Sequence, residues 1–284
     1  MAVLTLCAPF VPSTDLLADP PALRARAQAD GYLYLPGLLP AKAVNRLRAA
    51  VLQAAGDAGW CDGAGLAAPG VVPAVEGDQA FMAVYDQIQR LEVFHALALH
   101  PALLGLYRLL FEEEVLAHPR NICRVMFPRN NPYATPPHQD FLHVRGARDT
   151  WTAWIPLGDC PLALGGLAIM AGSHREPLLP IQTALGAGGA AVDTAALSYP
   201  WVEGDMALGD VLTFHSHTVH QALPNLTPCR MRLSADFRYQ PVTQPVVAAS
   251  LEPHYGRLSW EEIYAGWSSR ADAYYWRRLP LHVE

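Results

Sequence analysis

The chain has 284 residues, of which 51% are hydrophobic and 16% are charged. This balance predicts a folded protein with a large core and excludes a disordered chain. The net charge of −6 argues against nucleic acid and against an anionic membrane surface as partners. With 25 prolines and 21 glycines, the sequence is interrupted too often for a helical bundle. It also has no apolar run of the roughly 20 residues needed to span a bilayer.

The N-terminal segment and the cysteines indicate the cellular compartment. No basic residue precedes Asp15, whereas a secretory signal opens with positive charge. The five cysteines are scattered and form no CxxC motif, so a disulfide framework and a thiolate zinc site are both unexpected. These features predict a reduced, cytoplasmic protein.

The first part of the chain, about 21–118, is predicted to be mainly helical. Gly31 ends the first helix, and Tyr32–Leu35 alternates like a strand. Residues 57–80 lack a clear period and predict a long loop. The expected helices are Pro21–Asp30, a second after Pro40 with Val44, Leu47, Val51 and Leu52 as its apolar stripe, and Val84–Phe111 with a break near His100–Pro101.

After Pro119 the pattern changes to short apolar runs separated by turn residues, the spacing of a β-sandwich or barrel. Residues 184–194 are a Gly/Ala-rich insertion, and residues 256–284 are predicted to be helical and to pack on the body through aromatic side chains. We therefore expect one α+β domain over residues 1–284, with a β core at about 119–245. The predicted strands are Asn121–Phe127, Trp151–Leu157, Leu167–Met170, Val211–His215 and Arg232–Tyr239.

The strongest local motif is the His138-x-Asp140 pair. In an extended strand these two side chains project from the same face and can bind one metal ion together. The motif alone is a weak indication of a metal site, since a surface histidine near an acidic residue gives the same sequence pattern. The downstream histidines His215, His217 and His220 offer a third ligand from a distant strand.

Two histidines and one carboxylate favour ferrous iron and leave three adjacent coordination positions open. An α-keto acid can fill two of these positions, which leaves one for dioxygen. Arg232 and Ser234 lie on one face of their strand and could together hold the far carboxylate of such a co-substrate. Arginine suits this task because its planar guanidinium makes two-point contacts that lysine cannot make.

Five ordered blocks make the pattern specific: HQDFLHVRG, TWTAWIPLGD, GGLAIMAGSHR, GDVLTFHSHTVHQALPN and RLSADFRY. From about Asp30 to Tyr239 the chain resembles the phytanoyl-CoA dioxygenase family. The resemblance implies a double-stranded β-helix (jelly-roll) core. It also implies an oxygenase that uses Fe(II), 2-oxoglutarate and O2 to hydroxylate or otherwise oxidise a substrate, with release of succinate and CO2.

The resemblance also implies site residues. His138 and Asp140 match the first two iron ligands, and His220 matches the third because Asn225 follows it by five positions. The family's 2-oxoglutarate arginine falls between Arg230 and Arg232 in spacing, and the R-x-S pattern favours Arg232. Trp154 matches an aromatic residue beside the co-substrate, with a plain core tryptophan as the alternative, and Ser234 completes the predicted co-substrate site.

The retained Asp140 favours oxygen insertion over chlorination, because related halogenases replace this carboxylate. We expect a free small molecule or natural-product intermediate as substrate, since no basic cluster in the sequence matches the phosphates of coenzyme A.

The loops 57–80 and 182–200 are candidate lids. The competing hypotheses are a jelly-roll isomerase or hydrolase using Zn(II) or Mn(II), and a binding-only relative. The residues expected to face substrate are Arg124, Tyr133, Phe141, His143 and His217.

Overall fold

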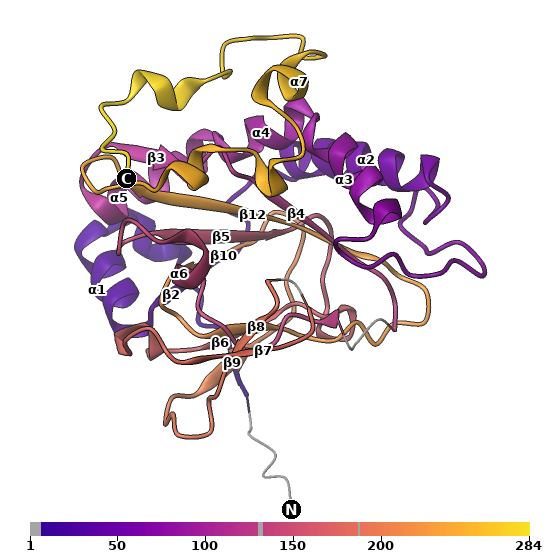
Figure 1. The fold of residues 1–284 in the computed structure, drawn as a ribbon. Helices are drawn as coiled ribbons and strands as arrows, with labels where there is room; N and C mark the ends of the chain where they lie inside the picture. Colours follow the sequence, from indigo (N-terminus) through magenta and orange to yellow (C-terminus); the bar gives the residue numbers. More distant parts are fainter. Residues whose placement is uncertain (1–6, 130–132, 187) are drawn as a thin grey trace, which may run out of the picture.

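A computed structural model describes residues 7–129, 133–186 and 188–284. Two main sheets face each other, and helices cover the outer side of the larger sheet (Figure 1). The large sheet has the strand order β2-β10-β5-β12-β3, with β4 also paired to β12, and the small sheet has the order β1-β9-β6-β11. The large-sheet strands are β2 (Tyr32–Leu35), β3 (Val115–Ala117), β4 (Ile122–Met126), β5 (Trp151–Pro156), β10 (Val211–His215) and β12 (Arg232–Pro241); the small sheet contains β1 (Ala8–Pro9), β6 (Leu167–Met170), β9 (Trp201–Glu203) and β11 (His220–Ala222).

The pairings within both sheets are antiparallel except for β1 with β9. Two such sheets packed face to face form the jelly-roll that the sequence predicts. The longest strand, β12, runs through the centre of the large sheet and pairs with β5 along one edge and with β4 and β3 along the other. The predicted α+β class with a double-stranded β-helix core is confirmed.

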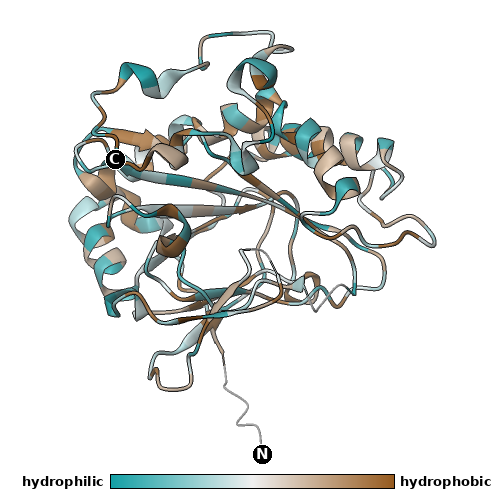
Figure 2. Cartoon of the chain, viewed as in Figure 1, coloured by the Kyte–Doolittle hydropathy of each residue, from teal (hydrophilic) through white to brown (hydrophobic). Residues whose placement is uncertain are grey.

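The strand β12 illustrates how the large sheet separates two environments. Successive side chains of a strand point to opposite faces. The apolar members of β12 belong to the core shared with the helices, and its polar members face the small sheet. Figure 2 shows this alternation along the ribbon as changes between hydrophobic and hydrophilic colours. The helix-facing residues are Leu233, Ala235, Phe237 and Tyr239; the inward-facing ones are Arg232, Ser234, Asp236 and Arg238.

The helices bury an apolar face against the sheet, and helix and sheet residues form one continuous hydrophobic cluster. The single domain over residues 1–284 stays a prediction. The predicted stripe of the second helix is entirely buried. The first helix ends where predicted, at Gly31, whose φ of +69° suits glycine and whose added Cβ would lie 2.2 Å from the His174 ring. The helices are α1 (Pro20–Asp30), α2 (Ala41–Asp57), α3 (Gln79–Gln89), α4 (Glu92–Ala98), α5 (Pro101–Phe111), α6 (Phe141–Val144) and α7 (Trp260–Tyr264).

The helical stretch predicted at Val84–Phe111 is divided twice. The expected break before Pro101 is present, and a second break at Arg90–Leu91 separates α3 from α4. By length and composition, Glu92–Phe111 alone among the described residues is apolar enough to cross a membrane. Phe94 and Tyr107 within this segment are completely buried in the core beside the sheet.

Two other expectations need correction. The insertion at 184–194 contains β8 (Ala190–Val192), which pairs with β7 (Ile181–Thr183) as a hairpin, because Gly186 and Gly189 allow the chain to reverse. The C-terminal segment is mostly turns and short 3-10 helix, with only α7 as α-helix. Its aromatic residues nevertheless pack as predicted, in a cluster that includes Trp260, Tyr264 and Trp276.

Candidate metal and co-substrate site

The strand and turn around His138 bring three predicted residues together between the sheets. The backbone N–H groups of His138 and His220 each donate to the other's carbonyl, at 3.0 and 3.1 Å, so the two imidazoles start from paired positions. The prediction of an extended strand through Asp140 is wrong. Asp140 has helical φ/ψ (−62°, −28°) because the chain turns there into α6, and the turn carries its carboxylate back toward both rings.

Three potential ligand atoms form a compact cluster. One atom from each of His138, Asp140 and His220 lies within 4.8 Å of the others, and all three residues are buried. Asp140 Oδ1 lies 3.6 Å from His138 Nε2 and 3.9 Å from His220 Nε2. No other group of three His, Cys, Asp or Glu side chains in the described part of the chain meets the same criterion. This donor set is the one that ferrous iron takes in 2-His-1-carboxylate sites.

Backbone carbonyls fix which nitrogen of each imidazole is available. His138 Nδ1 lies 2.9 Å from the carbonyl of Pro136, and His220 Nδ1 lies 3.0 Å from that of Thr218. Each Nδ1 therefore donates a proton, which leaves the Nε2 lone pairs directed at the cluster. Burial, reinforced by the nearby His138, lowers the pKa of His220 to about 3, so its ring stays neutral at physiological pH.

Asp140 is held by its other oxygen. Thr152 Oγ1 donates to Oδ2 at 2.7 Å, and Arg238 Nη2 donates to the same atom at 3.2 Å. Oδ1 is thereby left for the cluster. Burial favours the neutral acid, but the Arg238 guanidinium and the two imidazoles outweigh it and hold the pKa of Asp140 well below its usual value. The residue is a carboxylate oriented for one-oxygen ligation.

A small cavity of about 40 Å³ adjoins the three ligands, and Arg232 and Trp154 line it. Arg232 is buried, with its Cζ 5.8 Å from the Trp154 ring centre, and Nη1 donates to the Gly165 carbonyl at 2.9 Å. Arg232 Nε and Ser234 Oγ are buried donors without a partner among the described residues. Arg230, by contrast, is exposed, donates to the Asp159 carbonyl, and does not line this cavity.

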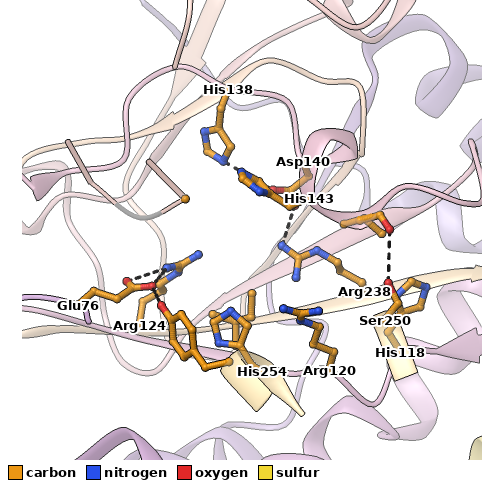
Figure 3. A pocket seen from close by; sticks show the side chains of 14 residues that line it. Glu76, His118, Arg120, Arg124, His138, Asp140, His143, Arg238, Ser250 and His254 are labelled. Carbon is orange, nitrogen blue, oxygen red and sulfur yellow. Dashed lines mark hydrogen bonds and ion pairs between the residues drawn. The ribbon is translucent and has the colours of Figure 1, made fainter. Parts of the chain in front are cut away.

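A larger cavity of about 260 Å³ opens on the other side of His138 and Asp140 (Figure 3). Each candidate lid supplies one residue to its lining, Glu76 from 57–80 and Gly188 from 182–200. Glu76 pairs with Arg124 at 2.8 Å and accepts a hydrogen bond from the Tyr255 hydroxyl. The 57–80 loop is thus bound to both the sheet and the C-terminal segment.

The remaining predicted residues divide between the cavity and other places. Arg124 and His143 line the larger cavity, as expected for substrate-facing residues. Phe141 and His217 pack against each other, with ring centres 4.5 Å apart, and line neither cavity. The remaining two lie elsewhere: Tyr133 borders a separate small pocket beside Arg124, and His215 lies 3.6 Å from Asp149, away from the three ligands.

Several residues of the two cavities were not identified from the sequence. Asp236 and Arg238 continue the two-residue period of Arg232 and Ser234 along β12. The sequence therefore contained a signal that could have placed them on the same face of the strand. Thr152 follows the same rule two positions before Trp154. No local sequence signal identified the other three residues. The turn between β3 and β4 carries His118 and Arg120, and the C-terminal segment carries His254. These segments reach the cavity only in the folded chain.

A jelly-roll with a His-Asp-His cluster between its sheets, and an arginine-bearing cavity beside it, defines the class of non-haem oxygenase folds. Residues 27–234 match the sequence profile of the phytanoyl-CoA dioxygenase (PhyH) family, and the chain belongs to this family. It is accordingly an oxidoreductase, and the expectation of Fe(II), 2-oxoglutarate and O2 chemistry is confirmed at the level of the family.

The chain is 29% identical over 255 residues to the 1-deoxypentalenic acid 11-beta-hydroxylase of Streptomyces arenae, covering 82% of this chain and 86% of the relative. Two solved structures share the fold at 22% identity. The epimerase SnoN, in complex with Fe3+, alpha-ketoglutarate and nogalamycin RO, has a TM-score of 0.59 and covers 81% of this chain and 86% of its own. The alpha-ketoglutarate-dependent carbocyclase SnoK has a TM-score of 0.55 and covers 78% and 84%.

Proposed function

We propose that this protein is a 2-oxoglutarate-dependent oxygenase that hydroxylates a small-molecule, natural-product substrate. His138, Asp140 and His220 would hold Fe(II), and the observation that carries the proposal is the clustering of their three ligand atoms within 4.8 Å. When bound, the iron supplies activation of dioxygen coupled to decarboxylation of 2-oxoglutarate. Everything else in the reaction depends on how the chain's own residues position the reactants.

Thr152 and Arg238 would act as positioning residues for the metal. Both donate to Asp140 Oδ2, so the carboxylate offers only Oδ1 and leaves room for other ligands. Partners of this kind around metal ligands typically contribute about 10- to 100-fold in metal affinity. The retained carboxylate also supports oxygenation rather than halogenation.

Arg232, with Trp154 and Ser234, would bind the far carboxylate of 2-oxoglutarate. Three features support this assignment: Arg232 lies in the cavity that also borders the three ligands, its Nε has no partner among the described residues, and Ser234 Oγ is a second unpaired donor on the same strand face. Trp154 provides the apolar wall. Arg230 lacks these features, since its guanidinium is on the surface.

Hydroxylation is the favoured outcome because the curated relative from Streptomyces arenae is named as a hydroxylase. The names epimerase and carbocyclase on the structural neighbours represent other outcomes of this fold. A cavity of about 260 Å³ suits a compact small molecule, and the overall charge of −6 disfavours nucleic acid. The predicted cytoplasmic location remains part of this proposal. The lids would exclude water once substrate is bound.

A Zn(II) or Mn(II) isomerase or hydrolase on the same ligands is the competing function, and a binding-only relative is another. Neither function needs a buried arginine beside the metal site as an anchor for a keto acid. The position of Arg232 therefore supports the oxygenase.

The test is anaerobic addition of Fe(II) and 2-oxoglutarate to the purified protein, followed by visible absorption. Two-point binding of the keto acid to iron is expected to give a weak charge-transfer band. Admission of air together with a candidate small-molecule substrate should then release succinate and CO2 while the substrate takes up the second oxygen atom of O2. Arg232→Ala should weaken 2-oxoglutarate binding strongly, whereas Arg230→Ala should leave it near wild type. Retained zinc affinity without the band would favour the isomerase or hydrolase, and a larger loss in Arg230→Ala would transfer the anchor to that residue.

A further inference from the structure

One of the three cations of the larger cavity has no carboxylate partner among the described residues. Three guanidinium groups line it, from Arg120, Arg124 and Arg238, against the two carboxylates of Glu76 and Asp140 (Figure 3). They belong to different parts of the fold: the turn before β4, β4 itself and β12. Their convergence is therefore a property of the folded cavity.

The three arginines differ in their partners. Arg124 is paired twice, with Glu76 at 2.8 Å and with Asp236 at 3.3 Å. Arg238 is paired with Asp140 at 3.2 Å. Arg120 has no carboxylate within ion-pair distance among the described residues, and its Nη1 donates only to the Ala249 carbonyl at 2.8 Å. Arg120 is thus the cation in this cavity whose charge is left unneutralised.

Two histidines of the cavity, His118 and His254, do not add to this charge, because they remain neutral. Burial, with repulsion from the arginines, lowers the pKa of His254 to about 2, and its Nδ1 lies 2.6 Å from the Tyr85 hydroxyl. Burial also lowers the pKa of His118 to about 4, and its Nε2 lies 2.8 Å from Gln240 Oε1. Both rings are held by protein partners, so the unused donors of this cavity belong to guanidinium groups. They are those of Arg120, which has no carboxylate partner, and Arg238 Nε, which is buried without a partner among the described residues.

We propose that the substrate is a carboxylic acid and that Arg120 binds its carboxylate, at the far side of the cavity from the His138–Asp140 edge. The inference rests on the proposed function and adds the substrate class to it. A guanidinium binds a carboxylate through two parallel hydrogen bonds, and burial strengthens such a contact. The substrate carboxylate supplies the ion-pair partner that Arg120 lacks, and its attachment at one fixed point orients the carbon skeleton toward the metal site.

The test uses pairs of probes that differ only in charge: cyclohexanecarboxylate, benzoate and adamantane-1-carboxylate, each against its carboxamide. Binding to the anaerobic Fe(II)·2-oxoglutarate protein is measured by calorimetry, with saturating 2-oxoglutarate so that its own site is filled. At least one acid should bind about 10- to 100-fold more tightly than its amide, the range expected for a hydrogen-bonded charge. Failure of every acid to exceed its amide would overturn the proposal.

Variants locate the contact. Arg120→Gln should lose the preference for acid over amide while it keeps amide binding, which shows that the cavity is intact. Arg120→Lys should keep part of the preference, because the charge remains and the two-point geometry is lost. Arg270→Gln removes an exposed arginine that lines neither cavity and should behave as wild type. An unchanged acid preference in Arg120→Gln would contradict the assignment.

The visible band of the Fe(II)·2-oxoglutarate complex separates this inference from the proposed function. If Arg120→Gln forms the band normally but loses acid binding, both stand. If the wild-type protein forms no band, the proposed function fails whatever the acids do. If Arg120→Gln loses the band and Arg232→Ala keeps it, Arg120 anchors the co-substrate and the substrate assignment is wrong.

Discussion

The two faces of the large sheet differ in chemistry although the same strands form both. On the helix side, β12 contributes Leu233, Ala235, Phe237 and Tyr239 to an apolar core, where close packing determines stability. On the side facing the small sheet, the alternate residues of the same strand are charged or polar and surround the His-Asp-His cluster. A two-residue period thus places structural and chemical side chains on opposite sides of one strand, and substitutions on the two faces should have separable effects.

The largest effect is expected at the inner face, from His138→Ala. Removal of this imidazole should abolish iron binding and reduce succinate formation to background, because two ligands remain of the proposed three. Unfolding of the metal-free protein should change little, since the His138 ring contacts few groups, namely the Pro136 carbonyl, the His220 ring and the Asp140 carboxylate. Iron per folded protein and succinate release are the measurements. His217→Ala is the control and should retain iron; loss of iron there instead would show that the ligand set is misassigned.

The outer face should respond in the opposite way. Phe237 is completely buried against Phe94 on α4, and Phe237→Ala leaves a cavity that should cost about 3–5 kcal/mol of unfolding free energy. At a low temperature at which Phe237→Ala is still folded, the variant should bind 2-oxoglutarate with near wild-type affinity. Denaturant unfolding and the visible charge-transfer band test the two statements. A stable variant without the band would mean that the faces are not independent.

Thr152→Val returns to the inner face and preserves the shape of the side chain. The variant loses the 2.7 Å hydrogen bond to Asp140 Oδ2, so the carboxylate is freer to rotate. Iron affinity should fall by about 10- to 100-fold, while the protein still folds. Competition with a chelator measures this affinity. An unchanged affinity would mean that Arg238 alone is sufficient to orient Asp140.

The same two-residue period explains how much could be predicted from the sequence. Patterns within a few residues, such as the α2 stripe or the alternation of β12, identified helices and strands because these signals are local. The local H-x-D motif supplied two ligand candidates, which the fold brings close to His220. Arg120 and His254 could not be identified as neighbours, since 134 positions separate them and only tertiary contacts bring them together. The local turn at Asp140 was missed for a related reason. The pairing of His138 with His220 fixes the path of the chain there, and a motif cannot reveal it.

A smaller, graded effect is expected at the helix side from pH. Burial lowers the pKa of His95 from 6.5 to about 4, and its Nε2 donates to the Gln89 carbonyl at 2.8 Å. Between pH 6.5 and 4 the unfolded chain binds a proton at this residue that the native protein does not. Stability should therefore fall as pH decreases through this window, by at most about 1.4 kcal/mol per pH unit from this group.

His95→Gln should flatten the pH dependence of the unfolding free energy by that amount, and urea titrations from pH 4 to 7 measure it. An identical slope in the variant would show that His95 does not contribute. His118 on the inner face also contributes to the pH dependence of the unfolding free energy, since its pKa is also lowered to about 4. The difference in slope between the wild type and the variant gives the contribution of His95 alone.

Ser234→Ala should give the smallest effect. It tests whether a single hydroxyl group on the inner face of the large sheet contributes to co-substrate binding and not to stability. The hydroxyl is buried without a partner among the described residues, so its removal should leave the unfolding free energy unchanged or slightly higher. If Ser234 binds 2-oxoglutarate together with Arg232, the dissociation constant should rise by about fivefold, corresponding to one hydrogen bond of about 1 kcal/mol. Titration of the charge-transfer band measures the constant. Ala235→Ser, one residue along on the helix side, reverses the expectation: stability should fall because a hydroxyl enters the apolar core, and 2-oxoglutarate affinity should not change.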